Sequence, residues 1–295
     1  MSSIKMKLCV LYSFLLGMVA IVSSCSRLIT NQSSSSTPYP ETKLGWKLGV
    51  QTYTFNRFTF FEAIDKIDSC GLKYVEGLTG QVIGEGIEGK LDYHMDASTK
   101  SQILQKLKEK GVKMVAFGVV NASNDADWHQ LFEFGKAMGI ETFTSEPEET
   151  DIPLLSKLCD EYKINIAIHN HPYPSRYWNP DIVLAAIKGQ SKRIGACADI
   201  GHWVRSGLDP VECLKKLEGH VLHLHMKDLN EKSNKMAHDV PWGTGVSNVE
   251  GVIQELKRQR FHGMISAEYE YNWYKNVPDV TASVKYFRKK LLAGQ

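Results

Sequence analysis

The sequence predicts an α/β protein that folds as a single (β/α)8 barrel, and three observations support this. Eight short apolar segments alternate with eight amphipathic segments over about 250 residues. Strands that alternate with helices form parallel sheets, and eight such units in this length fit a closed barrel better than a doubly wound sheet. No Gly-x-Gly-x-x-Gly segment follows the first apolar segment, so the usual signature of a dinucleotide-binding fold is missing.

The apolar segments are short and end in polar or small residues, which is typical of buried parallel strands. The expected strands are 48–53, 72–76, 112–119, 140–145, 164–169, 193–199, 221–226 and 264–268.

The helical segments carry apolar residues on one face and are bounded by capping residues, by proline in the first turn, or by glycine at the end. We expect helices at 59–69, 98–110 (capped by Ser98), 125–138, 152–162, 180–187, from 209–210 onward, at 248–259 and at 279–292. A glycine-rich loop is expected at 77–89.

The N-terminal 24 residues have the features of an export signal. Lys5 and Lys7 precede an apolar run at 8–22, about 15 residues long, which is short for a membrane span. The run ends in Val22-Ser23-Ser24-Cys25, which resembles a bacterial lipobox. We therefore expect a lipoprotein signal peptide at 1–24 and a lipidated Cys25; an ordinary signal peptide and an uncleaved anchor are the alternatives.

Residues 25–43 are expected to be a flexible tether, because the serine-rich stretch 33–38 has no apolar surface to bury. The predicted barrel then spans 44–295. Ser26 directly follows the cysteine, and in two-membrane bacteria this favours the outer membrane. The sequence thus predicts a periplasmic or outer-membrane-anchored lipoprotein whose only membrane contact is its lipid.

Composition and charge are those of a globular protein with no nucleic-acid partner. The chain has 295 residues, 43% hydrophobic, with 35 basic and 33 acidic side chains. Loss of Lys5 and Lys7 with the signal leaves 33 of each sign, so no excess of positive charge remains for nucleic acid. Cys159, Cys197 and Cys213 lie in apolar patterns and are expected to be buried thiols.

Carboxylates and imidazoles cluster at the ends of the predicted strands. A barrel brings these strand ends to one mouth, where barrel enzymes place their chemistry. The residues at these ends are Glu76, Glu146, His169, His171, Asp199, His202, His223, His225 and Glu268.

Three carboxylates and one imidazole from this set would form an oxygen-rich site for a divalent metal. Mn²⁺ or Co²⁺ is favoured, and Mg²⁺ or Zn²⁺ is possible. Each residue also has a structural interpretation. Glu146 or Glu268 alone would serve as an ion-pair partner, His223 as a hydrogen-bonded core histidine, and Asp199 with His202 as a loop cap.

The chain resembles the xylose isomerase-like TIM barrel superfamily over nearly all of 48–292. This superfamily includes the sugar phosphate isomerase/epimerase family, ketose 3-epimerases, inosose dehydratases and endonuclease IV. The segments that carry the resemblance are Leu48–Tyr53, His169–Pro172, Ala198–His202, His223–Asp228, Pro241–Gly245 and Glu268–Tyr269.

The resemblance implies a role for several of these residues. His171 would face the substrate, and His202 would bind the substrate or support the metal ligands. Lys227 and the loop 241–245, which includes Trp242, would shape the mouth. The metal ligands would be Glu146, Asp199, His225 and Glu268, with Glu148 and Glu149 as alternatives to Glu146.

One position departs from the pattern of the superfamily. Many relatives carry a glutamate near the end of the fifth strand, where this chain has His169, expected to contact the substrate. In epimerase relatives two metal-bound glutamates, Glu146 and Glu268 here, move protons on opposite faces of the sugar. The departure at His169 weighs against an epimerase.

The expected chemistry is metal-dependent enolisation next to a sugar carbonyl, with Glu146, Glu268 and His171 as the catalytic residues. An exported protein meets free sugars and glycosides more than sugar phosphates. We therefore expect a non-phosphorylated carbohydrate substrate and, as the leading hypothesis, β-elimination of a 3-keto-glycoside. A sugar 3-dehydrogenase is the expected supplier of the keto-sugar. Aromatic side chains expected at the mouth are Trp178, Trp242, Tyr271 and Trp273.

Two other classes of function remain open at this stage. Reprotonation after enolisation would make the protein a sugar isomerase or epimerase. A barrel without activity would be a sugar-binding lipoprotein, although four potential ligands argue against that. A nuclease is disfavoured because the chain has no basic excess. The oligomeric state does not follow from the sequence.

Overall fold

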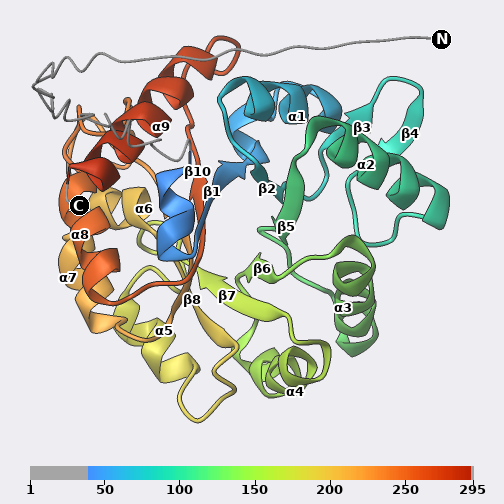
Figure 1. Cartoon of the computed structure of the whole chain (residues 1–295). Helices are drawn as coiled ribbons and strands as arrows, with labels where there is room; N and C mark the ends of the chain where they lie inside the picture. Colours follow the sequence, from blue (N-terminus) through green and yellow to red (C-terminus); the bar gives the residue numbers. More distant parts are fainter. Residues whose placement is uncertain (1–38, 294–295) are drawn as a thin grey trace, which may run out of the picture. The chain divides into compact units, whose positions relative to one another are not determined.

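The computed structural model describes residues 39–293 and contains a closed barrel of parallel strands in the order β1-β10-β9-β8-β7-β6-β5-β2 (Figure 1). The predicted (β/α)8 barrel is confirmed. The barrel strands are β1 (Trp46–Gln51), β2 (Tyr74–Gly77), β5 (Lys113–Phe117), β6 (Thr142–Ser145), β7 (Asn165–His169), β8 (Ile194–Asp199), β9 (Val221–Met226) and β10 (Gly263–Ala267).

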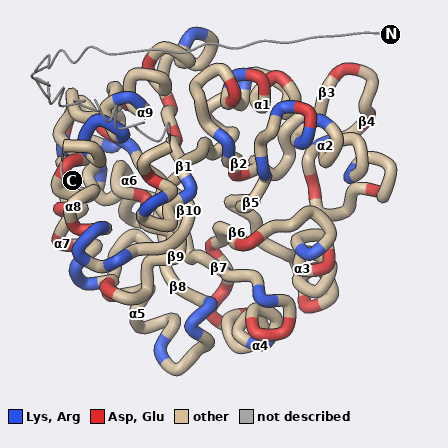
Figure 2. Tube along the Cα trace, in the orientation of Figure 1, with Lys and Arg blue, Asp and Glu red and all other residues tan. Residues whose placement is uncertain are grey.

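Helices form a ring around this barrel (Figure 1). Both signs of charge occur on the outer helices α2, α3 and α4 (Figure 2). The α-helices are α1 (Phe60–Ser69), α2 (Ala97–Lys110), α3 (Asp125–Met138), α4 (Ile152–Tyr162), α5 (Pro180–Ala186), α6 (Ile200–Arg205), α7 (Pro210–Lys216), α8 (Val249–Arg258) and α9 (Val277–Leu292). Three short 3-10 helices are η1 (Pro40–Leu44), η2 (Thr52–Phe55) and η3 (Glu149–Asp151).

Capping residues fix most helix starts where the sequence predicts them. Thr59 and Glu62 form a reciprocal capping box at the start of α1. The side chains of Asn179 and Asp209 accept hydrogen bonds from the first backbone N–H groups of α5 and α7. Gly139 ends α3 in the left-handed conformation, which glycine adopts without steric strain.

Two local predictions between β2 and β5 are wrong. Helix α2 is capped by Asp96, whose carboxylate accepts from the N–H of Thr99 at 2.7 Å, and Ser98 lies inside the helix. The segment 77–89, expected as a loop, contains the antiparallel pair β3 (Val82–Gly84) and β4 (Ile87–Lys90). Gly86, at φ +76°, allows the tight turn between them.

The expected strict alternation of strand and helix also fails between β8 and β9. Helices α6 and α7 both lie between β8 and β9. Helix α6 begins directly after Asp199, whose side chain accepts a hydrogen bond from the N–H of His202. The side chain of Asp199 therefore caps an extra helix at the mouth of the barrel.

Helix η1 spans the predicted boundary at Leu44 and overlaps the last residues of the expected tether. Glu41 is buried there against Arg288 of α9, with 2.7 Å between Oε1 and Nη2. The predicted signal peptide, Cys25 and the serine-rich stretch lie outside the described residues. None of the described helices is long and apolar enough to cross a membrane.

The interior is filled by aliphatic and aromatic side chains between strands and helices, such as Trp46, Phe132 and Phe143. Within residues 39–293 the cysteines are all free and buried, as expected for Cys159, Cys197 and Cys213. Burial raises the pKa of Cys159 and Cys213 to about 12, so both are unreactive packing groups.

Gly49 on β1 tests how tightly the barrel is packed. A Cβ atom there would lie 2.4 Å from the carbonyl oxygen of Tyr74 and 2.5 Å from Cε of Met264. Because backbone would have to shift, we expect Gly49→Ala to lower the free energy of unfolding by about 1–3 kcal/mol in urea titrations. Ser101→Ala, on the exposed face of α2, is the control, and equal stability of the two variants would contradict this packing.

Candidate metal centre

Four buried side chains converge inside the C-terminal end of the barrel. His169 ends β7, Asp199 ends β8, His225 lies on β9 and Glu268 follows β10. One ligand atom from each residue lies within 4.8 Å of the others. Parallel strands in register produce this convergence, since Asp199 pairs with His225 between β8 and β9.

The four facing atoms are His169 Nε2, Asp199 Oδ2, His225 Nδ1 and Glu268 Oε2. The distances are 3.0 Å from His225 Nδ1 to Glu268 Oε2 and 3.5 Å from His169 Nε2 to Asp199 Oδ2. All four atoms are buried, and none has a hydrogen-bond partner among the described residues. Because buried polar atoms are nearly always paired, such a group fits a divalent cation. Two imidazole nitrogens and two carboxylate oxygens suit a transition metal better than Mg²⁺.

Asp199 uses its two oxygens for different purposes. Oδ1 accepts a hydrogen bond from the N–H of His202 at 2.8 Å and so caps α6. Asn170 holds the backbone of Asp199 through two hydrogen bonds, each 2.9 Å long. The carboxylate is thereby oriented with Oδ2 toward the other three residues. The capping interpretation and the ligand interpretation of Asp199 are both compatible with this geometry.

Glu146 lies next to this group rather than in it. Its Oε1 is 3.1 Å from Nδ1 of His169 and also contacts Nδ1 of His171. Burial opposes ionisation of Glu146, but hydrogen bonds from the two histidines lower its pKa to about 2. The structure thus brings His169 to the position where we expected Glu146. The alternatives also lie elsewhere: Glu148 pairs with Arg176 at 2.5 Å, and Glu149 is exposed in η3.

A second buried carboxylate, Glu76, supports His225 from below. Its Oε2 lies 2.9 Å from Nε2 of His225, 2.8 Å from Nε2 of His223 and 2.7 Å from Oγ of Ser266. Its Oε1 accepts from Oγ1 of Thr144 at 2.6 Å. Contact through Nε2 leaves Nδ1 of His225 directed at the other ligand atoms, and such carboxylate–histidine pairs orient metal ligands.

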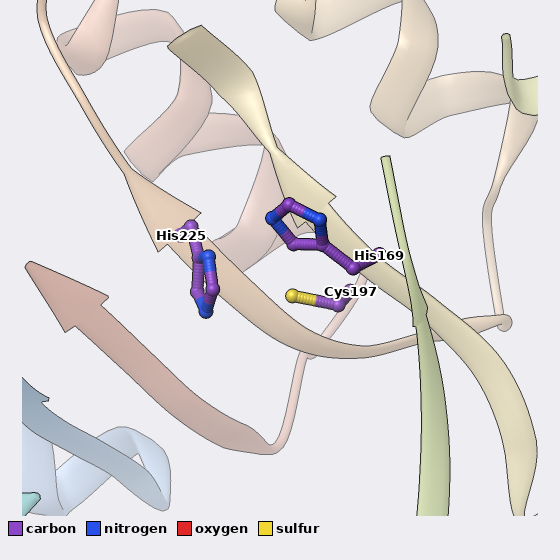
Figure 3. Close-up of side chains that lie close together, drawn as sticks. All are labelled: His169, Cys197 and His225. Carbon is purple, nitrogen blue, oxygen red and sulfur yellow. The ribbon is translucent and has the colours of Figure 1, made fainter. Parts of the chain in front are cut away.

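A thiol also lies close to the two histidines. His169, Cys197 and His225 point toward one another from β7, β8 and β9 (Figure 3). Burial raises the pKa of Cys197 to about 12, so the thiol is protonated and neutral. Cys197 lies two residues before Asp199 on β8, so its side chain fills the layer of the barrel interior below Asp199.

Lys227 is fully buried among three carboxylates. Its Nζ lies 3.0 Å from Asp199 Oδ2, 2.8 Å from Glu268 Oε2 and 2.5 Å from Glu270 Oε1, and only the contact with Glu270 has hydrogen-bond geometry. Burial opposes the charge, but these carboxylates raise the pKa of Lys227 well above its usual value. Lys227 in turn helps to lower the pKa of the buried Glu268 to about 2. We expected Lys227 to shape the mouth of the barrel, but its side chain is fully buried and lies behind the residues that line the cavity.

A cavity of about 380 Å³ opens above the four residues. His171, with 49% of its side chain exposed, and His202 both line it, with their ring centroids 5.1 Å apart. The residues that line the cavity are Gln51, Tyr53, Leu78, Val119, His169, His171, His202, Glu268 and Glu270.

The aromatic side chains expected at the mouth have different positions. Trp242 is buried against Phe287, with ring centroids 5.8 Å apart, and does not line this cavity. Its loop is drawn inward because the N–H groups of Gly243 and Gly245 donate to Asp228. Trp273 packs edge-on against the cavity residue Tyr53 at 5.6 Å. Trp178 packs on Tyr173, and Tyr271 stacks on His238.

A buried charge network behind His202 was not predicted from the sequence. Arg205 contacts His202, Asp239 and Glu270. Burial lowers the pKa of His202 well below its usual value. The positive charges of Lys227 and Arg205 lower this pKa further, whereas the carboxylate of Asp199 opposes them. Burial raises the pKa of Asp239 to about 8. Glu270 could have been predicted as a site residue from its spacing of two residues from Glu268. Arg205 could not, because it lies on helix α6, which was not predicted.

Comparison with known proteins places the chain in a family. A family model described as xylose isomerase-like TIM barrel matches residues 64–290, and the chain belongs to this family. A search of curated proteins finds no match.

Solved structures with this fold include three that overlap most of the chain. An uncharacterised protein from Parabacteroides distasonis is 35% identical, with 83% of this chain and 99% of that chain covered and a TM-score of 0.69. A D-tagatose 3-epimerase-like protein is 18% identical over 84% and 97% of the two chains, with a TM-score of 0.68. A xylose isomerase-like protein from Mycobacterium smegmatis, solved in complex with magnesium, is 13% identical over 84% and 97%, with a TM-score of 0.66. The last two likenesses show the fold alone.

Metal titration distinguishes His169 from Glu146 as the ligand. We expect His169→Gln to weaken Co²⁺ binding more than 100-fold because a direct ligand is replaced. Glu146→Gln removes only the partner of that ligand and should weaken binding about 10-fold. Calorimetry measures both, and the reverse order would restore Glu146 as the ligand.

A second titration tests the support from Glu76. Glu76→Gln replaces an acceptor of four contacts by an amide that also donates, so we expect Co²⁺ affinity to fall about 10–100-fold. Thr144→Val is the matched control, because it removes a hydrogen bond to Glu76 without touching His225. Equal affinity of the two variants would show that Glu76 does not orient His225.

Proposed function

We propose that this protein is a divalent-metal-dependent enzyme that removes the proton beside the carbonyl of a non-phosphorylated keto-sugar. The specific reaction that we propose is β-elimination of a 3-keto-glycoside, which makes the protein a 3-keto-glycoside 1,2-lyase. Membership of the xylose isomerase-like family supports the broader class, because structures with this fold include sugar epimerases. The specific reaction rests on the cavity.

The observation that carries the proposal is the difference between two ionisable groups that line the cavity. His171 lines the cavity, and Glu146 contacts its Nδ1. Glu268 also lines the cavity and is held as a carboxylate next to the ammonium of Lys227, at 2.8 Å. Epimerisation needs two groups that exchange roles as acid and base. One base together with a carboxylate that stays ionised suits removal of one proton followed by expulsion of a leaving group.

His169, Asp199, His225 and Glu268 would hold the ion. A divalent ion held there would supply Lewis acidity to the substrate's carbonyl oxygen. His171, oriented by the negatively charged Glu146, would take the proton from C2 of the sugar through Nε2. The anionic partner stabilises the imidazolium that results.

The elimination balances without another reactant. The electron pair of the C2–H bond forms the C1–C2 double bond, and the bond from C1 to the glycosidic oxygen breaks. The departing oxygen takes one proton from solvent, and the aglycone leaves as an alcohol. The sugar is left as a 2-hydroxy-3-keto-glycal.

The charges of the cavity favour a substrate without phosphate. Among the described residues that line the cavity there is no lysine or arginine, while Glu268 and Glu270 are both present. Lys227 and Arg205 lie behind the wall and are paired with carboxylates. A phosphate would therefore meet anions and no free cation, whereas a neutral sugar meets hydrogen-bonding groups.

We propose export as a periplasmic or outer-membrane lipoprotein, anchored through Cys25. In that compartment a sugar 3-dehydrogenase would supply the keto-glycoside. The motif at 22–25 supports the anchor. The described residues that line the cavity include no lysine or arginine to bind a phosphate, which agrees with a free carbohydrate.

A sugar isomerase or epimerase is the second candidate, because the fold is shared with epimerases. It would use the same first proton transfer and then return the proton. A barrel that only binds sugar is less consistent with four buried ligand atoms that have no hydrogen-bond partner among the described residues.

Proton NMR in D₂O tests the reaction, with residues 26–295 and Mn²⁺ or Co²⁺. A 3-keto-glucoside should release its aglycone and form the keto-glycal, whereas a panel of free ketoses should remain unchanged. Deuterium incorporation into a free ketose without cleavage would favour the isomerase or epimerase. The absence of both exchange and bound metal would favour the binding protein.

Glu268→Gln should abolish cleavage and leave the fold intact, because it removes a proposed ligand. Glu148→Gln, at an exposed carboxylate away from the cavity, is the control and should keep full activity. Full activity of Glu268→Gln would overturn the proposed metal site. Circular dichroism checks the fold of both variants.

A further inference from the structure

The side chains of His202 and Arg205 form a buried pair on helix α6. Both lie within this short helix, three residues apart, and are 6% and 8% exposed. Nη1 of Arg205 lies 3.1 Å from Nδ1 of His202 with hydrogen-bond geometry. We infer that Arg205 is a positioning residue that makes His202 a dedicated hydrogen-bond donor to a substrate oxygen. The inference deepens the proposed function and rests on it for the identity of the substrate.

The chemistry of the two groups fixes the position of the imidazole proton. A guanidinium has only N–H donors and stays protonated in proteins. Nδ1 of His202 must therefore offer its lone pair to Arg205. A neutral imidazole carries one N–H, so the proton of His202 lies on Nε2.

Arg205 is itself held on several sides. The carbonyl oxygen of Ala237 accepts from Nε at 3.3 Å and from Nη2 at 3.2 Å. Oδ2 of Asp239 lies 3.4 Å from Nη2, and Oε2 of Glu270 lies 3.3 Å from Nη1. These contacts come from the segments after β9 and β10, so the guanidinium cannot turn away without breaking them.

The Nε2–H group of His202 is left free for a ligand. Its nearest acidic oxygen is Oδ2 of Asp199 at 3.5 Å, a contact that is not a hydrogen bond. The ring lines the cavity. In this tautomer Nε2 has no lone pair, so His202 is neither a base nor a metal ligand. This agrees with its absence from the ligand groups found among the described residues.

The role of His202 then follows from what it donates to. An Nε2–H donor binds a carbonyl or ether oxygen, and both occur in a keto-glycoside. It also leaves His171 as the one cavity histidine, outside the proposed ligands, that can act as a base. His202 thus contributes to binding and orienting the sugar, while His171 moves the proton.

Nitrogen NMR of the full chain labelled with ¹⁵N-histidine tests the tautomer directly. The wild-type protein should show an unprotonated Nδ1 and a protonated Nε2 for His202, assigned by loss of the signal in His202→Gln. Arg205→Met should convert His202 to the other tautomer or to a mixture, whereas Arg205→Lys, which keeps a donor, should retain the wild-type pattern. A protonated Nδ1 in the wild type, or an unchanged pattern in a folded Arg205→Met variant, would overturn the inference.

Kinetics with a 3-keto-glucoside test the consequence. We expect Arg205→Met to lower kcat/KM about 100-fold, as for loss of one well-placed donor, and Arg205→Lys to recover at least part of it. His202→Gln, whose amide can donate, should retain more activity than His202→Leu. Arg258→Met, at a half-exposed arginine on α8, is the control and should be unchanged. If the protein does not cleave keto-glycosides, the proposed reaction fails, but the NMR experiment still shows whether Arg205 sets the tautomer of His202. Failure of the proposed reaction is therefore distinguishable from failure of this inference.

Discussion

The buried ammonium of Lys227 is the interaction on which the rest of the mouth depends. A charge at 0% exposure is stable only if opposite charges surround it, and Asp199, Glu268 and Glu270 do so within 3.0 Å. Those carboxylates come from two different strand ends, so the lysine fixes the relative position of β8 and β10 at the mouth. Removal of Lys227 would leave three clustered carboxylates without this counter-charge, which is far more costly than loss of an exposed pair.

The same carboxylates help to direct the proposed ligand atoms toward one another. Asp199 commits one oxygen to the start of α6 and Glu268 directs one toward His225. From below, Glu76 fixes the ring of His225, while Glu146 contacts Nδ1 of His169 from the side. Each ligand is therefore oriented by a residue outside the group, and this arrangement keeps the cluster open for a cation.

The sequence was sufficient for the fold because its signals are local. Helix starts at Asn179 and Asp209 follow from capping side chains and proline, and strand ends follow from apolar runs. Helix α6 was missed because it has only six residues and is apolar on most sides, which resembles a loop that continues a buried strand. The sequence predicted Ser98 rather than Asp96 as the cap of α2 because both residue types are good helix caps. Only the backbone geometry shows that Asp96 is the cap.

The site was predictable as a set of strand ends but not as a list of ligands. Asp199, His225 and Glu268 lie together as the parity of their strands requires. Whether Glu146 or His169 joins them depends on how far β6 and β7 extend at the mouth. Strand β7 ends at His169, whose ring enters the barrel, whereas Glu146 lies just beyond β6 and remains partly exposed. Arg205 and Trp242 depended on long-range contacts, with Glu270 and Phe287, that no local pattern reveals.

Replacing a glutamate by His169 also changes the balance of charge in this cluster. Asp199, Glu268 and Glu270 supply three negative charges against the two positive charges of Lys227 and Arg205. A fourth carboxylate in the position of His169 would raise the excess of negative charge from one to two. The imidazole of His169 adds no negative charge, while the charge of Glu146 lies against His171, where it can stabilise a proton gained during the reaction. The position that departs from the pattern of many relatives is thus a histidine between two carboxylates, with Nε2 3.5 Å from Asp199 and Nδ1 3.1 Å from Glu146. The same oxygen of Glu146 contacts the proposed base His171.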